Sequence, residues 1–169
     1  MPDCWKEAYL TKRIFPDVLD KHIAQVRAQK KSIATLNGSF DLLHAGHLEI
    51  IYQASQQADC LIVALNSDAS IAAYKSPSRP ILPLEERLQL VAALSFVSYV
   101  THFDELDPRK LLTRIRPDVH VNGANYTATC IEADLIRSYG GRLHLVELFP
   151  GRSTTSIIEK MRKSSSKKN

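Results

Sequence analysis

Short continuous apolar runs alternate along the chain with longer stretches in which apolar residues recur every three or four positions. The runs have the length of strands and predict strands at 33–36, 60–65, 98–103, 119–121 and 143–148. The recurring stretches predict helices at 16–29, 44–58, 69–74, 83–94, 107–115, 131–139 and 154–162. Continuous rather than alternating apolarity is typical of parallel strands that are covered on both faces. The pattern therefore predicts an α/β fold: a Rossmann-like, doubly wound, five-stranded parallel sheet with helices on both faces.

The two ends of the chain depart from this regular pattern. Residues 1–15 give no clear period, so we expect 1–30 to be an N-terminal segment whose one amphipathic helix packs on a main domain at 31–162. The last residues are rich in serine and lysine, a composition typical of solvated chain. We therefore expect 163–169 to be a disordered basic tail.

The net charge of +4 has a definite location in the chain. Residues 160–169 hold five basic side chains and no acidic one, so the rest of the chain carries a net charge of −1. A basic tail without a basic face disfavours nucleic acid as a partner. No apolar run approaches the roughly 18 residues of a membrane span, and the start has no signal-peptide pattern. These features predict a cytoplasmic protein with no membrane partner.

The cysteines give little information about function. Cys4, Cys60 and Cys130 are far apart, and their spacing matches neither a disulfide framework nor a set of metal ligands. Cys60 lies in an apolar run and is expected to be a small core residue.

Candidate chemistry is concentrated where the first strand gives way to a helix. Asn37-Gly38 ends the strand, and His44-Ala45-Gly46-His47 opens the helical pattern. Two imidazoles three residues apart lie on the same side of the first turn. Free backbone N–H groups and the positive end of the helix dipole face the same way, and Gly46 lets a ligand approach the backbone. This arrangement predicts an anion site, and specifically a phosphate site.

The sequence Asn-Gly-Ser-Phe-Asp followed by His-Ala-Gly-His resembles the signature of the HxGH nucleotidyltransferases, the cytidylyltransferase-like superfamily. Within it, the likeness is to the bacterial D-glycero-β-D-manno-heptose 1-phosphate adenylyltransferases of ADP-heptose synthesis, a part of lipopolysaccharide biosynthesis. The resemblance covers roughly 31–159, and the matching stretches are 37–47, 61–70, 75–87, 116–127 and 151–158. The resemblance is to the nucleotidyltransferase half alone, so we expect a nucleotidyltransferase without the sugar-kinase domain.

The resemblance implies an enzyme that transfers a nucleoside monophosphate from a nucleoside triphosphate, expected to be ATP, to a sugar phosphate. Pyrophosphate is the other product, and Mg²⁺ is expected with the nucleotide. His44 and His47 would stabilise the α-phosphate in the transition state. Lys75 and Arg79 would join them from a loop that closes over the site.

The resemblance also implies binding residues. Those expected to bind the nucleotide are Asn37, Gly38, Ser39, Phe40, Asp41, Gly46, Gly123, Asn125, Tyr126, Ser153, Thr154 and Thr155. Those expected near the phosphate of the acceptor are Asn66, Asp68 and Arg87. No side chain is expected to bind a metal directly, apart from Asp68 as a candidate.

Several of these side chains have a second interpretation. Asp41 would either orient a histidine or cap the helix, and Asp68 would either face a phosphate or cap the next helix. Lys75 and Arg79 are otherwise solvated loop charges. Arg87 would otherwise pair with an acid on its own helix surface.

Two departures from the family pattern leave the substrate open. The family usually has a lysine at the position of Asn122 and an aspartate at that of Asn125. One alternative is therefore a CTP-dependent cytidylyltransferase that acts on glycerol 3-phosphate or a related polyol phosphate. Another is a non-catalytic nucleotide sensor on the same fold. A homodimer is expected by resemblance alone.

Overall fold

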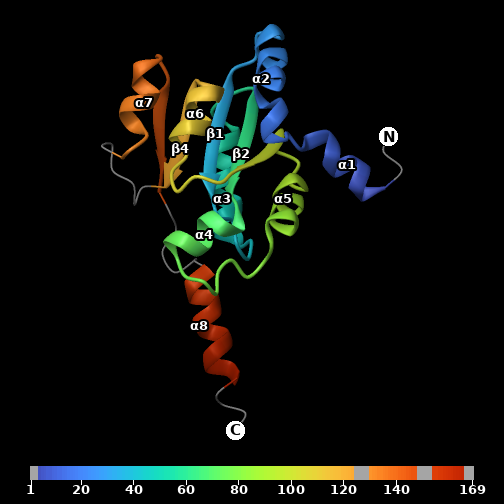
Figure 1. Ribbon diagram of the computed structural model, residues 1–169, viewed down its shortest axis with the longest axis vertical. Coiled ribbons are helices and arrows are strands. Elements are labelled where there is room, and N and C mark those ends of the chain that lie inside the picture. Colours follow the sequence, from blue (N-terminus) through green and yellow to red (C-terminus); the bar gives the residue numbers. More distant parts are fainter. Residues whose placement is uncertain (1–3, 124–129, 148–153, 166–169) are drawn as a thin grey trace.

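The computed structural model describes residues 4–123, 130–147 and 154–165, and these form a parallel sheet with helices on both faces (Figure 1). The strands are β1 (Ile33–Gly38), β2 (Cys60–Asn66), β3 (Tyr99–Phe103), β4 (Val119–Gly123) and β5 (Arg142–Val146). They lie in the order β3-β2-β1-β4-β5, and every pairing is parallel. The predicted five-stranded, doubly wound sheet is confirmed.

The helices follow the strands in the alternation that the sequence predicts. They are α1 (Trp5–Lys12), α2 (Leu19–Ala28), α3 (Ala45–Ser55), α4 (Asp68–Tyr74), α5 (Leu84–Ala92), α6 (Arg109–Ile115), α7 (Ala133–Ser138) and α8 (Thr154–Ser165), with a 3₁₀ turn at Pro16–Val18. None of the described helices is long and apolar enough to span a membrane.

Two hydrophobic clusters, one on each face of the sheet, explain the continuous apolar runs. Alternate residues of β2, such as Leu61 and Val63, pack with α3 and α5. The residues between them, such as Ile62 and Ala64, pack with α2 and α6. Because each face has its own helical cover, both sets of alternating positions in β2 are apolar up to Asn66 at its carboxyl end.

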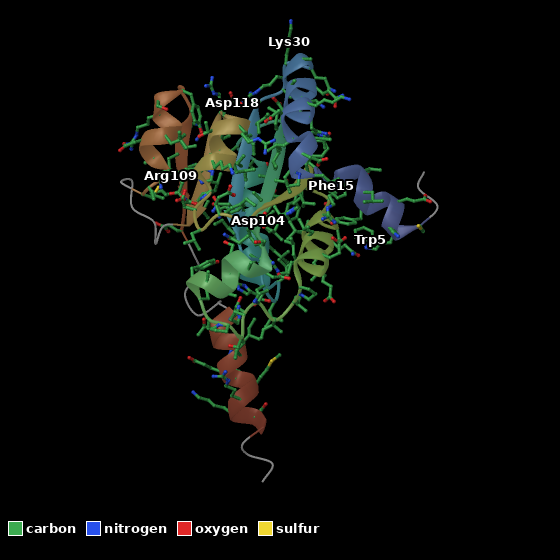
Figure 2. The ribbon with its side chains drawn as sticks, in the orientation of Figure 1. Trp5, Phe15, Lys30, Asp104, Arg109 and Asp118 are labelled. Atoms are coloured by element: carbon green, nitrogen blue, oxygen red, sulfur yellow. The ribbon has the colours of Figure 1, made fainter. Side chains whose placement is uncertain are left out.

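Helix α1 was not predicted. Tyr9 is its one buried residue, so the segment has no apolar stripe that a periodic pattern could reveal. The helix is held against the domain by specific contacts instead. Lys12 Nζ donates to the carbonyls of Ala92 and Leu94 at 3.0 Å each, and Trp5 Nε1 donates to Gln89. Figure 2 shows Trp5 and Phe15 at the side of the molecule where α1 lies.

Some boundaries also differ from the prediction. Helix α3 ends at Ser55 instead of 58, and α7 begins at Ala133 instead of 131. Helix α8 continues to Ser165, into the segment expected to be a disordered tail from 163. Arg162 and Lys163 lie in its last turn, where cations interact favourably with the helix dipole. The four remaining residues, 166–169, are outside the described part of the chain.

Candidate active site

A cavity of about 610 Å³ lies at the carboxyl ends of the three central strands. Asn37 and Gly38 of β1, Asn66 of β2, and Asn122 and Gly123 of β4 all line it. This is the edge where open parallel sheets bind ligands. Its size is within the range of small-molecule sites.

Most of the predicted site residues meet in this cavity. Those that line it are Asn37, Gly38, Ser39, Phe40, His44, Gly46, His47, Asn66, Lys75, Gly123, Thr154 and Thr155. Asn125, Tyr126 and Ser153 lie outside the described residues. Asp41, Asp68, Arg79 and Arg87 do not belong to the lining.

The two histidines are held together at the start of α3. His44 is the N-cap, and its Nδ1 accepts hydrogen bonds from the backbone N–H groups of Gly46 and His47 at 3.1 and 3.4 Å. The two imidazole rings stack with centroids 3.8 Å apart and an interplanar angle of 20°. Because Nδ1 of His44 accepts, the neutral ring carries its proton on Nε2.

This cap changes one part of the predicted anion site. The amides of Gly46 and His47 were expected to be free for a ligand, but they donate to the His44 ring. The imidazole N–H groups are therefore the donors that the start of α3 offers to the cavity. The helix dipole adds to them whether or not the amides are bonded.

The electrostatic surroundings keep both imidazoles neutral at pH 7. Burial lowers the pKa of His44. Burial, with smaller contributions from His44 and Lys75, lowers the pKa of His47 to about 4. Nδ1 of His47 is buried and has no hydrogen-bond partner among the described residues. A neutral imidazole still donates through one ring N–H, so the pair can bind an anionic oxygen.

The turn between β1 and α3 has an uncommon backbone. Phe40 and Leu42 have φ of 46° and 52°, in the left-handed region that non-glycine residues seldom adopt. A Cβ at Gly38 would lie 3.2 Å from the Phe40 ring, so glycine gives this ring its room. The ring in turn packs edge-on against His47, with centroids 5.3 Å apart. The turn therefore positions the histidine as well as the backbone.

Among the described residues, Lys75 is the lysine or arginine that lines the cavity. Its Nζ donates to Ser39 Oγ at 2.9 Å, which places the ammonium beside the turn after β1. Burial lowers the pKa of Lys75, and the nearby Arg79 adds to this effect. An anionic ligand would offset both effects.

Arg79 is used in a different way. Its Nε donates to Asp41 Oδ2 at 2.7 Å, and the Asp41 side chain is fully buried. Asp41 also accepts hydrogen bonds from the amides of Ile81 and Leu82 at about 3 Å. Burial alone would raise the pKa of Asp41, but these amides and Arg79 together lower it. Asp41 thus neither orients a histidine nor caps α3; it holds the loop after α4 against the turn after β1.

Arg87 is a buried clamp, so it is not available to bind an incoming phosphate. It is fully buried, and its guanidinium donates to the carbonyls of Leu82, Ser39 and Asn66 at 3.0, 2.6 and 2.9 Å. The same group donates to Asp68 Oδ1 at 2.7 Å. Three loops at the edge of the cavity are joined by this one side chain.

Asp68 completes the clamp. Its Oδ2 accepts from the amide of Leu84, the first residue of α5, so it caps α5 and not the helix in which it lies. The cap of α4 is Ser67, whose Oγ accepts from the amide of Ser70. Each oxygen of Asp68 accepts one hydrogen bond, and the side chain is 48% exposed. In the described parts of the chain, no group of three or more His, Cys, Asp or Glu side chains is placed to hold one.

Other residues of the cavity had no signal in the sequence. They are Leu36, Ile50, Tyr74, Leu106, Asp107, Pro108, Ile131 and Glu132, with Asn122, which was noted only as a departure from the family pattern. They come from segments that meet only in the folded chain, and no local motif marks them. A second hollow of about 380 Å³ lies beside α1 and α5, and none of its described lining residues is a cation.

The site therefore combines a stacked pair of neutral imidazoles, a lysine and the N-terminus of α8, all at the carboxyl edge of a doubly wound parallel sheet. Donors of this kind bind the phosphates of a nucleotide. Such a fold and site are typical of nucleotidyltransferases.

Comparison with known proteins gives the family. The chain belongs to the cytidylyltransferase-like family, whose model matches residues 35–167. It is 47% identical over 136 residues to the bifunctional protein HldE of Syntrophotalea carbinolica. The matched residues make up 80% of this chain and 28% of that protein. It is 45% identical over 148 residues to HldE of Geobacter sulfurreducens, or 87% of this chain and 30% of that protein. The chain thus spans less than a third of the length of these relatives.

Solved structures agree with this assignment. The lipopolysaccharide core biosynthesis protein of Thermoplasma volcanium has a TM-score of 0.57 at 25% identity and covers 70% of this chain and 97% of that one. Pantoate–beta-alanine ligase of Francisella tularensis has a TM-score of 0.59 at 14% identity and covers 89% of this chain and 77% of that one. The latter likeness concerns the fold alone.

Proposed function

We propose that this domain transfers a nucleoside monophosphate from ATP to D-glycero-β-D-manno-heptose 1-phosphate and releases pyrophosphate. The observation that carries the proposal is the stacked His44–His47 pair at the start of α3, in a cavity that Lys75 also lines. The HldE relatives and the stretches that resemble heptose adenylyltransferases support the choice of substrates.

In this reaction an oxygen of the sugar phosphate attacks the α-phosphorus in line. A new P–O bond forms as the bond to the β-phosphate oxygen breaks, and pyrophosphate leaves with the bonding electrons. No protein nucleophile is required, so the protein contributes position and charge stabilisation. The N–H groups of His44 and His47 would donate to the α-phosphate oxygens, where charge is redistributed in the transition state.

The leaving group would be stabilised from two sides. Lys75 supplies a positive charge beside the turn after β1. Thr154 and Thr155 line the cavity at the start of α8, where helix amides and hydroxyls suit the β- and γ-phosphates. Thr154 already donates its hydroxyl to the carbonyl of Asp41, so Thr155 is the freer hydroxyl of the two.

A divalent cation, expected to be Mg²⁺, would accompany the triphosphate and neutralise part of its charge. The described side chains form no ligand cluster for a resident ion, so the ion would be bound mainly through the nucleotide. A homodimer is expected by resemblance.

The test is pyrophosphate release in the presence of Mg²⁺, with ATP and CTP each combined with heptose 1-phosphate and glycerol 3-phosphate. We expect turnover with ATP and heptose 1-phosphate and its loss in His47→Ala. Asp134→Asn, which changes a fully exposed carboxylate on α7, is the control and should keep full activity. Turnover with CTP and glycerol 3-phosphate alone would favour the cytidylyltransferase alternative. Nucleotide binding without pyrophosphate release in any combination would favour the sensor.

A further inference from the structure

Glu132 is a buried carboxylate in the wall of the cavity that the proposed mechanism does not use. The residue is 3% exposed and lines the cavity close to the end of β4. Its Oε2 is buried and has no hydrogen-bond partner among the described residues. A buried polar atom without a partner costs free energy, and a charged one costs more. Such an atom in a ligand cavity points to a ligand that completes its hydrogen bonds.

The usual structural explanation for an acid at this position does not apply. Glu132 is the N-cap residue of α7, yet its side chain makes no capping hydrogen bond. Two side chains interact with it. The pKa of Arg109 is raised by Asp107 and, to a lesser degree, by the charge of Glu132. Burial raises the pKa of the Cys130 thiol, and the hydrogen bond to Glu132 adds to this shift. Asn122 Nδ2 in turn lies 3.8 Å from Cys130 Sγ. Oε2 itself takes part in no hydrogen bond with the described residues.

The chemistry of the carboxylate limits what it can bind. An ionised carboxylate only accepts hydrogen bonds, and it repels phosphate. The phosphate donors of the cavity are the histidines on α3, Lys75 and the start of α8. Glu132 lies just before α7 and lines the cavity together with the end of β4, so it would face a part of the ligand that carries no phosphate.

Other residues that line the cavity indicate which part of the ligand Glu132 would contact. Leu106, Pro108 and Ile131 line the same cavity, and Leu106 and Ile131 are 67% and 53% exposed. Asp107 and Asn122 line the cavity with them, and apolar side chains combined with a few polar groups suit a nucleoside, whose base has an apolar face and a few donors at its edge. A sugar phosphate, with hydroxyls all round, would leave these apolar surfaces unmatched.

We propose that the Glu132 carboxylate accepts a hydrogen bond from the nucleoside and thereby selects the nucleotide. The donor is either the exocyclic amino group of the base or a ribose hydroxyl. Adenine and cytosine carry that amino group at the corresponding edge, whereas hypoxanthine and uracil carry a carbonyl, which would repel the carboxylate. This inference rests on the proposed function and adds a specificity residue to it.

The experiment measures nucleotide affinity by calorimetry in MgCl₂ without an acceptor. The nucleotide is ATP or CTP, whichever binds more tightly, and it is compared with its carbonyl analogue (ITP or UTP) and with its 2′-deoxy form. We expect the unchanged protein to prefer the natural nucleotide over one of these analogues by about ten- to a hundredfold, the worth of a charge-assisted hydrogen bond. Glu132→Gln should reduce that preference at least tenfold.

Asp134→Asn is the matched control, because it makes the same carboxylate-to-amide change two residues away on α7 at a fully exposed position. It should keep the preference of the unchanged protein. A role of Glu132 in stability alone would weaken all nucleotides equally and leave the ratios unchanged in Glu132→Gln, which would overturn the inference. Equal binding of all three nucleotides by the unchanged protein would overturn it as well, even where the variant does not fold. Absence of any nucleotide binding would instead contradict the proposed function itself.

Discussion

The hydroxyl of Thr154 donates a hydrogen bond of 2.7 Å to the backbone carbonyl of Asp41, a residue 113 positions earlier in the chain. This bond ties the start of α8 to the turn that carries the histidines. The side chain of Asp41 meanwhile holds the loop that contains Arg79. Asp41 therefore joins three segments around the cavity although it does not line the cavity itself. Figure 1 shows the rest of α8 extending away from the sheet, so its first turn is the part that matters for the site.

Asp41→Asn should destabilise the protein by about 3–5 kcal/mol, because it leaves the guanidinium of Arg79 buried without its counter-charge. The side chains of Asp41 and Arg79 are only 0% and 13% exposed, so water cannot compensate. Urea unfolding of the variant measures the loss. Asp20→Asn is the control, since it removes a carboxylate that is 70% exposed from its pair with Arg114 and should cost less than about 1 kcal/mol.

The stability that the Asp41–Arg79 pair contributes should decrease at acidic pH. The pKa of Asp41 is lower in the folded protein than in the unfolded chain, so its contribution is complete above the ordinary carboxyl pKa and is lost as the pH falls through the folded value. In Asp41→Asn, the free energy of unfolding should therefore fall less steeply as the pH is lowered. An equally steep fall in the variant and the unchanged protein would contradict the assigned pairing of Asp41 with Arg79.

The contacts of Arg87 could not be predicted from the sequence motif. A resemblance places a cation near the phosphates, but it cannot tell which groups the cation contacts in the folded chain. Here the carbonyls of three loops and Asp68 take up the guanidinium. Charge near a phosphate site was predictable from the sequence, whereas this clamp depends on loops that come together only on folding.

Arg87→Lys should destabilise the protein by about 2–4 kcal/mol, because one ammonium cannot replace a planar group that serves four acceptors. The nucleotide affinity of the fraction that remains folded should change little. Thermal unfolding and nucleotide titration measure the two effects separately. Arg109→Lys on α6, where the side chain is 51% exposed, is the control and should be nearly neutral (Figure 2). A large loss of nucleotide affinity with unchanged stability would instead indicate that Arg87 binds a phosphate.

The fold was more predictable than the site, for a physical reason. Strands covered on both faces must be apolar throughout, so runs such as 60–65 are visible without knowledge of the tertiary structure. The histidines were visible because the two occupy one helical turn. Glu132 had no such signal, since its role depends on burial beside β4, and α1 had none because it buries a single side chain. Periodicity reports burial along one element and not contacts between elements.

His120 should make the stability of the protein depend on pH between about 6.5 and 4. The ring is fully buried in β4, its Nδ1 lies 2.8 Å from Thr35 Oγ1, and burial lowers its pKa to about 4. The unfolded chain binds a proton near pH 6.5 and the folded protein does not, so stability falls as the pH drops through this range. The full effect is about 3 kcal/mol.

Urea unfolding at several pH values checks this effect. His120→Asn should remove about half of the pH dependence, whatever the variant does to stability at neutral pH, because His47, whose pKa is also lowered to about 4, contributes a similar amount. His144→Asn is the control on the edge strand β5, where the ring is only partly buried, and it should change the slope less. An identical slope in His120→Asn and the unchanged protein would show that another group is responsible.

His47 should take up a proton when a nucleotide binds. In the free protein its pKa is about 4 because of burial and of the nearby His44 and Lys75. A triphosphate beside the ring would favour the charged imidazolium and raise the pKa. By linkage, affinity then increases as the pH falls from the pKa of the complex toward 4.

Calorimetry at pH 6 in buffers of different ionisation enthalpy measures the proton uptake directly. His47→Gln should take up fewer protons than the unchanged protein, whereas His144→Gln, outside the cavity, should take up the same number. Because the nucleotide's own protonation is common to all three proteins, equal uptake in His47→Gln and the unchanged protein would mean that the ring stays neutral in the complex and would contradict this prediction.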